Sequence, residues 1–269
     1  MSEDWLKAVD RPRRAARVDP SLPNVARVWN YLVGGRDNFE ADRQAAKQLV
    51  AAAPLMEQVA PASRAFLRRA VTYLAAEAGI RQFLDIGTGM PTAGNTHEVA
   101  QAVDQTCRIV YVDNDPVVLS HARAGLRSAE KGETSYLEAD ARDIKAVIGG
   151  ASETLDFTQP VGVIMIDILN FLEEAADVLD QLTAAVPVGS YLAVMQPARD
   201  GRLAVAARRW NQLAATPVFL RDRTQVARWF TGLQLVDPGI VEVHRWRPEP
   251  GDPVFPEGMP LLVAVARKP

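Results

Sequence analysis

Phe83-Leu-Asp-Ile-Gly-Thr-Gly-Met-Pro91 is the stretch of sequence that decides the fold, because in it an apolar run ends in an acidic residue and a Gly-x-Gly turn. A second apolar run ends in acid in Val110-Tyr-Val-Asp-Asn-Asp-Pro116. A glycine turn after one strand and an acid at the end of the next are typical of parallel sheets that bind a nucleoside-bearing cofactor across the carboxyl ends of their strands.

The composition of the chain limits the domain organisation and the partners that we expect. The chain has 269 residues, of which 48% are hydrophobic and 23% charged, and this suits one large α/β domain, alone or with a helical appendage. The net charge of −3 gives no basic surplus of the kind that nucleic-acid binding usually needs, so we expect no nucleic-acid partner. The basic run Arg11 to Arg14 is interpreted as a solvated tail.

Cellular location is predicted from cysteine use and from apolar runs. Cys107 is the single cysteine, so no intrachain disulfide can form, which fits a reducing compartment. The sequence has neither an apolar run of roughly 18 residues nor an N-terminal signal pattern. We therefore expect a cytoplasmic protein without membrane contact.

Hydrophobic periodicity divides the chain near residue 80. Before it the pattern is helical, over 24–33, 39–53 and 61–78, with Gly79 closing the third helix. After it, strands alternate with helices, which favours a doubly wound, mostly parallel seven-stranded sheet of an α/β fold. The expected strands are 82–86, 108–112, 134–138, 161–167 and 190–195, with antiparallel closing strands at 233–236, 241–244 and 261–266. The expected intervening helices lie near 96–104, 116–129, 142–149 and 173–185. We expect residues 1–80 to form a helical lid over the substrate and residues 81–269 to bind the cofactor.

The glycine turn itself narrows the choice of cofactor. Gly87 and Gly89 remove side chains where the backbone turns and approaches a ligand. Asp85 would repel a phosphate but is well placed to hold an ammonium group. The third glycine of the dinucleotide fingerprint would fall at Thr92, so the sequence departs from the nicotinamide pattern.

Acids also end the second and third strands. Asp113 can accept hydrogen bonds from both ribose hydroxyls, or it can cap the helix after Pro116, a role that Asp115 fills better. Asp140 can accept from the exocyclic amine of adenine while the N–H of Ala141 reaches a ring nitrogen. The alternative for Asp140 is a helix cap, for which Asp143 competes.

Three acids at successive strand ends, with no Lys or Arg in the glycine loop, describe a cationic cofactor without phosphate. S-adenosylmethionine fits, because its sulfonium and ammonium groups are positive. We expect Thr88 and Asn114 to complete the binding set.

With these motifs the chain resembles the class I S-adenosylmethionine-dependent methyltransferases. It more closely resembles a bacterial family within them that has an N-terminal signature. The motifs that carry the resemblance are Asn24-Val-Ala-Arg27, Tyr31-Leu-Val-Gly-Gly-Arg-Asp-Asn-Phe39, Asp85-Ile-Gly-Thr-Gly-Met-Pro-Thr-Ala-Gly-Asn95, Tyr111-Val-Asp-Asn-Asp-Pro116, Phe230-Thr-Gly-Leu233 and Trp246-Arg-Pro248. The resemblance runs from about residue 20 to the end. It implies a Rossmann-like methyltransferase fold and the cofactor, but not the acceptor.

The N-terminal signature has two interpretations. In the first, it forms a lid over the cofactor, in which Arg36 and Asn38 bind the cofactor and Arg36 lies near its carboxylate. Tyr31 or Phe39 then lies near the sulfonium, which an aromatic face can stabilise. Alternatively, Gly34 and Gly35 with the residues beside them form a plain turn between helices, with Asp37 or Asn38 as a cap.

The end of the fourth strand is expected to face the methyl group and the acceptor. The resembled family commonly has a small or aliphatic residue at position 167 and His at position 170, where this chain has Asp167 and Asn170. Asparagine cannot act as a general base, whereas Asp167 can act as one or bind an ammonium group. Asp167, Asn170 and Tyr31 are therefore the predicted catalytic residues, and a cap of the helix near Glu173 is the alternative for Asp167.

Three functions stay open. The first is methyl transfer to a small molecule. The second keeps the cofactor but attacks Cγ of its methionine part, closing a small ring and releasing methylthioadenosine. The third is cofactor binding without catalysis. The three histidines share no metal-like spacing, so we expect no metal, and a homodimer is left open.

Overall fold

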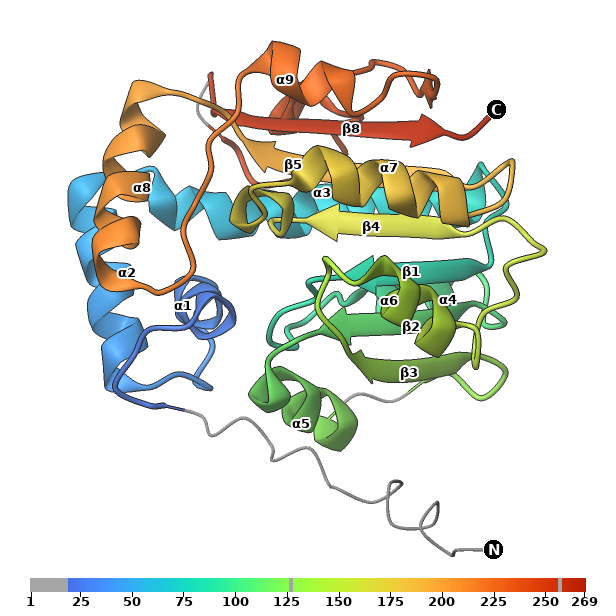
Figure 1. Ribbon diagram of the computed structural model, residues 1–269, viewed down its shortest axis with the longest axis horizontal. Coiled ribbons are helices and arrows are strands. Elements are labelled where there is room, and N and C mark those ends of the chain that lie inside the picture. The colour runs from blue at the N-terminus through green and yellow to red at the C-terminus, as the bar shows by residue number, and fades with distance from the viewer. Residues whose placement is uncertain (1–18, 126–127, 256–257) are drawn as a thin grey trace, which may run out of the picture.

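The computed structural model describes residues 19–125, 128–255 and 258–269, and in it one sheet lies between two layers of helices (Figure 1). The basic run Arg11 to Arg14 and the expected continuation of a helix through residues 126–127 fall outside these ranges.

The sheet follows the order β3-β2-β1-β4-β5-β8-β6, with β7 paired to β8. The strands are β1 Gln82–Ile86, β2 Arg108–Asp113, β3 Glu133–Glu138, β4 Gly162–Ile166, β5 Tyr191–Pro197, β6 Gln234–Leu235, β7 Val241–Glu242 and β8 Leu261–Arg267. The first five are parallel, and β8 runs antiparallel to β5. The doubly wound sheet is confirmed. The eight strands of the described residues overlap the eight segments expected from the sequence, and the two-residue β7 pairs with β8 beside β6, so the sheet has one strand more than the predicted total of seven.

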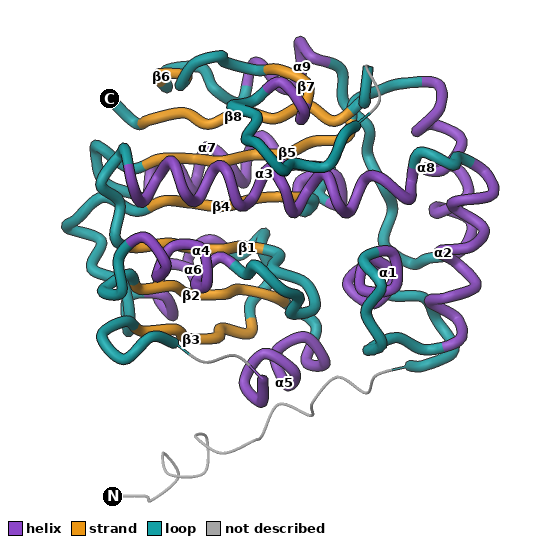
Figure 2. The backbone as a smooth tube through the Cα atoms, turned by 180° about the vertical axis from the view of Figure 1, so that it is seen from behind, coloured by secondary structure: helices purple, strands orange, loops and turns teal. Residues whose placement is uncertain are grey.

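The helices cover both faces of the sheet and one of its ends. They are α1 Val25–Leu32, α2 Glu40–Ala52, α3 Met56–Ala76, α4 Thr96–Val103, α5 Pro116–Gly125, α6 Ile144–Ala151, α7 Ala175–Ala185, α8 Gly201–Leu213 and α9 Arg223–Arg228, with 3₁₀ turns at Leu169–Phe171 and Val243–Arg245. Helices α6 and α7 lie on the near face in Figure 1, and α3 crosses the opposite face, which is turned toward the viewer in Figure 2. Helices α1, α2 and α8 gather at the carboxyl ends of the parallel strands.

Side-chain alternation along the strands explains this layering. In β1, Phe83 packs on the side of α3, whereas Leu84 and Ile86 pack on the side of α6 and α7. All three side chains are fully buried. Burial of a large apolar side chain contributes roughly 1.5–3 kcal/mol, so the two-sided core holds both helical layers to the sheet.

One predicted helix boundary was wrong. The third helix begins at Met56, not at Pro61, and the proline lies inside it. Met56, Val59 and Ala60 are buried against the core, so apolar packing extends the helix past a residue that lacks the N–H for its hydrogen bond. Gly79, with φ of +70°, follows the end of the helix as expected.

A buried carboxylate ties α1 to α2. Asp42 is fully buried and accepts hydrogen bonds from the backbone N–H groups of Asn24, at 2.9 Å, and Phe39, at 2.8 Å. It also pairs with the buried Arg27 at 2.8 Å. The Asn24 side chain caps α1 by accepting from the N–H of Ala26 at 2.8 Å. These contacts fix the start of α1 against the start of α2.

The turn between α1 and α2 is equally constrained. The Oδ1 atom of Asn30 accepts from the N–H of Asp37, at 3.0 Å, and from the side-chain amide of Asn38, at 2.9 Å. A Cβ atom at Gly35 would lie 2.3 Å from the Asn30 amide, which leaves room only for glycine, and Gly34 has φ of +81°.

We predict that Asp42→Ala lowers the free energy of unfolding by about 3–5 kcal/mol, because the buried Arg27 loses its nearest carboxylate and keeps only Asp115, 3.8 Å away. The backbone N–H groups of Asn24 and Phe39 lose their acceptor as well. Chemical denaturation measures this. The exposed Glu40→Ala in the same helical turn is the control and should leave the unfolding midpoint nearly unchanged. A midpoint for Asp42→Ala that matches the control would contradict the anchoring role.

Candidate functional site

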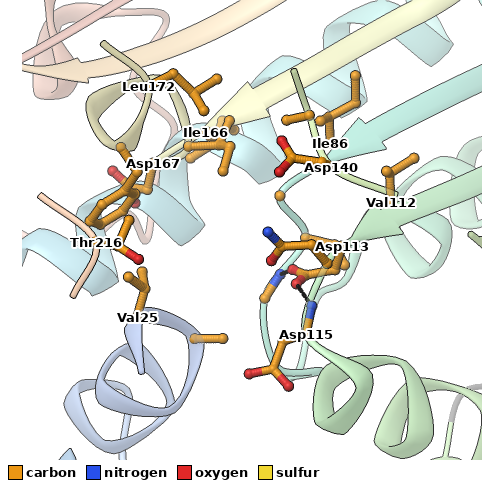
Figure 3. Close-up of a pocket in the computed structure, with 18 of the residues that line it drawn as sticks. Val25, Ile86, Val112, Asp113, Asp115, Asp140, Ile166, Asp167, Leu172 and Thr216 are labelled. Carbon is orange, nitrogen blue, oxygen red and sulfur yellow. Dashed lines mark hydrogen bonds between the residues drawn. The ribbon is translucent and has the colours of Figure 1, made fainter. Parts of the chain in front are cut away.

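A cavity of about 540 Å³ lies at the carboxyl ends of the parallel strands. Figure 3 shows two walls, with Asp113, Asp115 and Asp140 on one and Val25, Asp167 and Thr216 across from them. The first wall comes from the ends of β1, β2 and β3. The second comes from α1, the end of β4 and the loop 215–219. The strand order reverses at β1, because β2 and β3 lie on one side of it and β4 and β5 on the other. The cavity lies at this switch point, where doubly wound sheets bind their ligands.

The glycine loop, residues 87–95 after β1, lines the cavity through Gly87, Thr88 and Gly89. Gly87 and Gly89 have φ of +75° and +65°, and a Cβ atom at Gly87 would lie 2.6 Å from the Ile168 side chain. Asp85 is buried beneath the loop and accepts a hydrogen bond from the Thr96 hydroxyl at 2.5 Å. Burial raises the pKa of Asp85 to about 6.

Asp113 lies at the end of β2 with both carboxylate oxygens engaged by backbone. One accepts from the N–H of Gly89 and the other from that of Asp115, each at 2.9 Å. Burial raises the pKa of Asp113. Asp115 accepts from the N–H of Val117 at 2.8 Å at the start of α5, which is the capping role expected of it. Asn114 and Thr88 also line the cavity.

Asp140 lines the cavity beyond the end of β3, next to the buried Ala141. Its carboxylate pairs with Arg142 at 2.5 Å, and the hydrogen bond from this guanidinium lowers the pKa of Asp140. The cap of α6 is Asp143, which accepts from the N–H of Ala146 at 3.0 Å. Asp140 is therefore not needed as a cap.

Four predicted site residues do not line this cavity, namely Tyr31, Arg36, Asn38 and Asn170. Tyr31 is half-buried against the core, Arg36 is exposed, and Asn38 bonds to Asn30 within the turn after α1. Their cofactor-binding and catalytic roles stay predictions, and the turn explains why Asn38 is held where it is. Helix α1 lines the cavity through other residues, among them Val25 and Trp29.

Arg64 of α3 lines the cavity, and sequence reasoning missed it. Its guanidinium donates to the carbonyls of Ala93, at 3.0 Å, and Gly94, at 2.6 Å, in the glycine loop. It also interacts with the Asp85 charge, while burial lowers the pKa of the guanidinium. An arginine within a helical pattern carries no sign of this role, because only the packing of α3 against the loop brings it here.

Asp167 follows β4 with φ of +59°, a left-handed conformation that costs a non-glycine residue roughly 1–2 kcal/mol. Its Oδ2 atom accepts from the indole N–H of Trp29 at 3.2 Å and, in a short hydrogen bond, from the Ser63 hydroxyl. Its Oδ1 atom is shielded from solvent and has no hydrogen-bond partner within the described chain. Burial raises the pKa of Asp167 to about 7.

Asn170 faces a second, smaller cavity of about 50 Å³. It is 3% exposed, and its Oδ1 atom has no hydrogen-bond partner in the described part of the chain. Apolar side chains form the rest of this small cavity, and Val25, Trp29 and Phe171 line both cavities. The structure thus separates Asn170 from Asp167, and the rings of Trp29 and Phe171 lie between the two spaces.

In residues 19–125, 128–255 and 258–269, no three His, Cys, Asp or Glu side chains are grouped so that they could hold a metal ion. Nor does any helix in these ranges combine the length and the apolar character needed to cross a membrane.

The raised pKa of Asp167 predicts a pH dependence of stability. The folded chain keeps this proton up to about pH 7, whereas the unfolded chain releases it near pH 4, so this group lowers the free energy of unfolding as the pH rises between those values. Asp167→Asn removes that loss. Relative to wild type, the variant should gain about 2 kcal/mol between about pH 5 and pH 8 in urea denaturation. Equal differences from wild type at both pH values would contradict the assignment, and the exposed Asp177→Asn is the control.

Comparison with known proteins adds the family. A model of the S-adenosyl methyltransferase family matches residues 11–269. A DUF574 family protein from Streptomyces avermitilis shares 39% identity, with a TM-score of 0.89 over 94% of this chain and 100% of that one. A protein from Thermobifida fusca, provisionally assigned as a methyltransferase, shares 36% identity, with a TM-score of 0.84 over 92% of this chain and 96% of that one.

More distant structures agree on the fold alone. Magnesium protoporphyrin IX methyltransferase from Synechocystis, solved with bound S-adenosylhomocysteine, has a TM-score of 0.54 at 13% identity over 80% of this chain and 87% of that one. No curated protein matches. The predicted fold and cofactor are confirmed: the chain belongs to the S-adenosyl methyltransferase family, has the class I fold and uses S-adenosylmethionine.

Proposed function

We propose that this protein transfers the methyl group of S-adenosylmethionine to a small-molecule acceptor. The observation that carries the proposal is that one 540 Å³ cavity joins the glycine loop and the acids of β1, β2 and β3 to a second wall that ends in Asp167. A cavity of this size is typical of small-ligand sites. Helix α1 and the loop 215–219 help to enclose it, which favours a small acceptor over a macromolecule.

The residues present fit the cofactor part by part. Asp113 has spare lone pairs beyond its two backbone hydrogen bonds, because an ionised carboxylate has about four acceptor sites, and these suit two ribose hydroxyls. Asp140 suits the adenine amine, and the N–H of Ala141 suits a ring nitrogen. Gly87 and Gly89 let the backbone approach closely.

The methionine part is assigned to Asp85 and Arg64. The carboxylate of Asp85 attracts the ammonium group, and the guanidinium of Arg64 attracts the carboxylate, the role first predicted for Arg36. The two protein side chains already interact with each other, so a zwitterion placed between them meets complementary charges.

The bound cofactor supplies an electrophilic methyl group on a sulfonium. The chain's own contribution is to position the acceptor, to exclude water and to accept a proton. Asp167 is the carboxylate that we assign to this task, because its partners Trp29 and Ser63 hold it in place, whereas Glu173 and Glu174, which also line the cavity, are exposed. We also propose that α1 acts as the lid over the substrate, since Val25, Ala26 and Trp29 line the cavity.

We predict that Asp113→Ala weakens binding of S-adenosylhomocysteine at least about tenfold in calorimetry, because two charge-assisted hydrogen bonds are lost. The control is Asp143→Ala, which removes a helix cap outside the cavity and should keep the affinity. An unchanged dissociation constant of S-adenosylhomocysteine for Asp113→Ala would contradict the assignment of Asp113 to the ribose.

Cyclisation of the cofactor is the second candidate, because Asp167 is a base on the transfer side of the cavity. Mass spectrometry of the protein incubated with S-adenosylmethionine separates the two reactions. Methyl transfer predicts S-adenosylhomocysteine, formed only when an acceptor is added. Methylthioadenosine that accumulates without any acceptor would favour cyclisation, and tight binding without turnover would favour a non-catalytic role.

A further inference from the structure

We propose that the acceptor is a small amine, which enters as its ammonium ion and is held by Asp167 in the main cavity, next to the apolar side cavity. This inference rests on the proposed methyl transfer and specifies its substrate class. Four observations support it: the Asp167 carboxylate without a counter-charge in the described part of the chain, the charge of the cavity, the aromatic rings that line it, and the neighbouring side cavity.

The carboxylate of Asp167 lines the cavity without a counter-charge among the described residues. Trp29 and Ser63 both donate to its Oδ2 atom, which leaves Oδ1 buried without a partner. No arginine, lysine or histidine of the described residues forms an ion pair with it. A buried carboxylate without a counter-charge is costly, and a ligand that brings a positive charge and an N–H donor removes that cost.

The cavity as a whole attracts cations. Of the described residues that line it, seven are Asp or Glu and two are Arg, namely Arg64 and Arg142. Arg142 is already paired with Asp140. The single net positive charge of the cofactor offsets part of this surplus, so the field still favours a cationic second ligand and opposes an anionic one.

Aromatic rings line the same cavity as Asp167 and can face an ammonium group bound to it. Trp29, Phe171 and Phe219 line the cavity, and the hydrogen bond from Trp29 to Asp167 fixes the indole beside the carboxylate. Ring faces attract cations by about 0.5–2 kcal/mol, more so when water is excluded. A carboxylate with rings next to it therefore recognises an ammonium better than an alcohol or a phenol.

The side cavity sets the shape of the rest of the acceptor. It holds about 50 Å³, shares Val25, Trp29 and Phe171 with the lining of the main cavity, and is lined almost wholly by apolar side chains. A short aliphatic arm fits this space. The free Oδ1 atom of Asn170 is the exception in the lining, and it would satisfy one hydroxyl or N–H donor on that arm.

Asp167 acts as the base in the proposed reaction. The carboxylate takes a proton from the ammonium, and the freed nitrogen lone pair attacks the methyl carbon. The carbon–sulfur bond breaks with its electron pair passing to sulfur, so S-adenosylhomocysteine leaves. The product is the N-methylated ammonium ion, and the proton on Asp167 passes to solvent.

Binding to the protein saturated with S-adenosylhomocysteine tests the proposal. Butylamine, 1-butanol and butyrate share one short chain and differ in charge, and their dissociation constants are measured by NMR titration of the full chain. We expect butylamine to bind at least about tenfold more tightly than 1-butanol and butyrate to bind most weakly. A butylamine affinity no better than that of 1-butanol would overturn the proposal.

Asp167→Asn is the decisive variant, because asparagine tolerates the left-handed conformation at this position and keeps one oxygen for Trp29 or Ser63. The variant should lose most of the preference for butylamine while binding S-adenosylhomocysteine within about twofold of wild type. Asp177→Asn, which removes an exposed charge outside the cavity, should keep the preference. A preference that survives Asp167→Asn overturns the assignment, whereas wild-type protein that fails to bind S-adenosylhomocysteine refutes the proposed function itself.

Discussion

Carboxylates gathered at the carboxyl ends of parallel strands, with too few cations to neutralise them, are the constraint on which the rest of this site depends. Asp85 and Asp113 lie near the ends of β1 and β2, Asp167 follows the neighbouring β4, and burial raises the pKa of each. Such an arrangement costs folding free energy in the absence of a ligand. Cationic or hydrogen-bond-donating ligands offset this cost, and in the proposed binding mode S-adenosylmethionine brings an ammonium, a sulfonium and ribose hydroxyls to these carboxylates.

The remainder of the fold keeps those carboxylates in one enclosed space. Parallel β1, β2 and β4 bring their ends to one edge, and the positive φ values of Gly87 and Gly89 let the loop turn beneath the ligand. Helix α1 covers the same edge because Asp42 fastens it to α2 through Arg27 and backbone N–H groups. Trp29 on α1 then reaches Asp167, so an N-terminal anchor and the acceptor wall form one connected structure.

Patterns with a local cause could be predicted from the sequence, and arrangements made by packing could not. The strand–glycine–acid motifs placed Asp85, Asp113 and Asp140 at the cavity because periodicity and turn chemistry act within a few residues. The start of α3 was wrong because burial overrode the local effect of Pro61. Arg64 was missed because its partners lie about thirty residues away in the glycine loop. Asn170 lies at the side cavity because the turn after β4 directs it there, which its place in the sequence did not reveal, and its role stays a prediction.

A crystal structure of the protein with S-adenosylhomocysteine tests the central claim most directly. The measured quantity is the set of distances from the carboxylate oxygens of Asp113 to the two ribose hydroxyls. Both hydroxyls are predicted to lie within roughly 2.5–3.2 Å of those oxygens, with the adenine amine at Asp140 and the homocysteine part between Asp85 and Arg64. A cofactor product bound in the cavity with its ribose away from Asp113, or bound elsewhere on the protein, would contradict this arrangement.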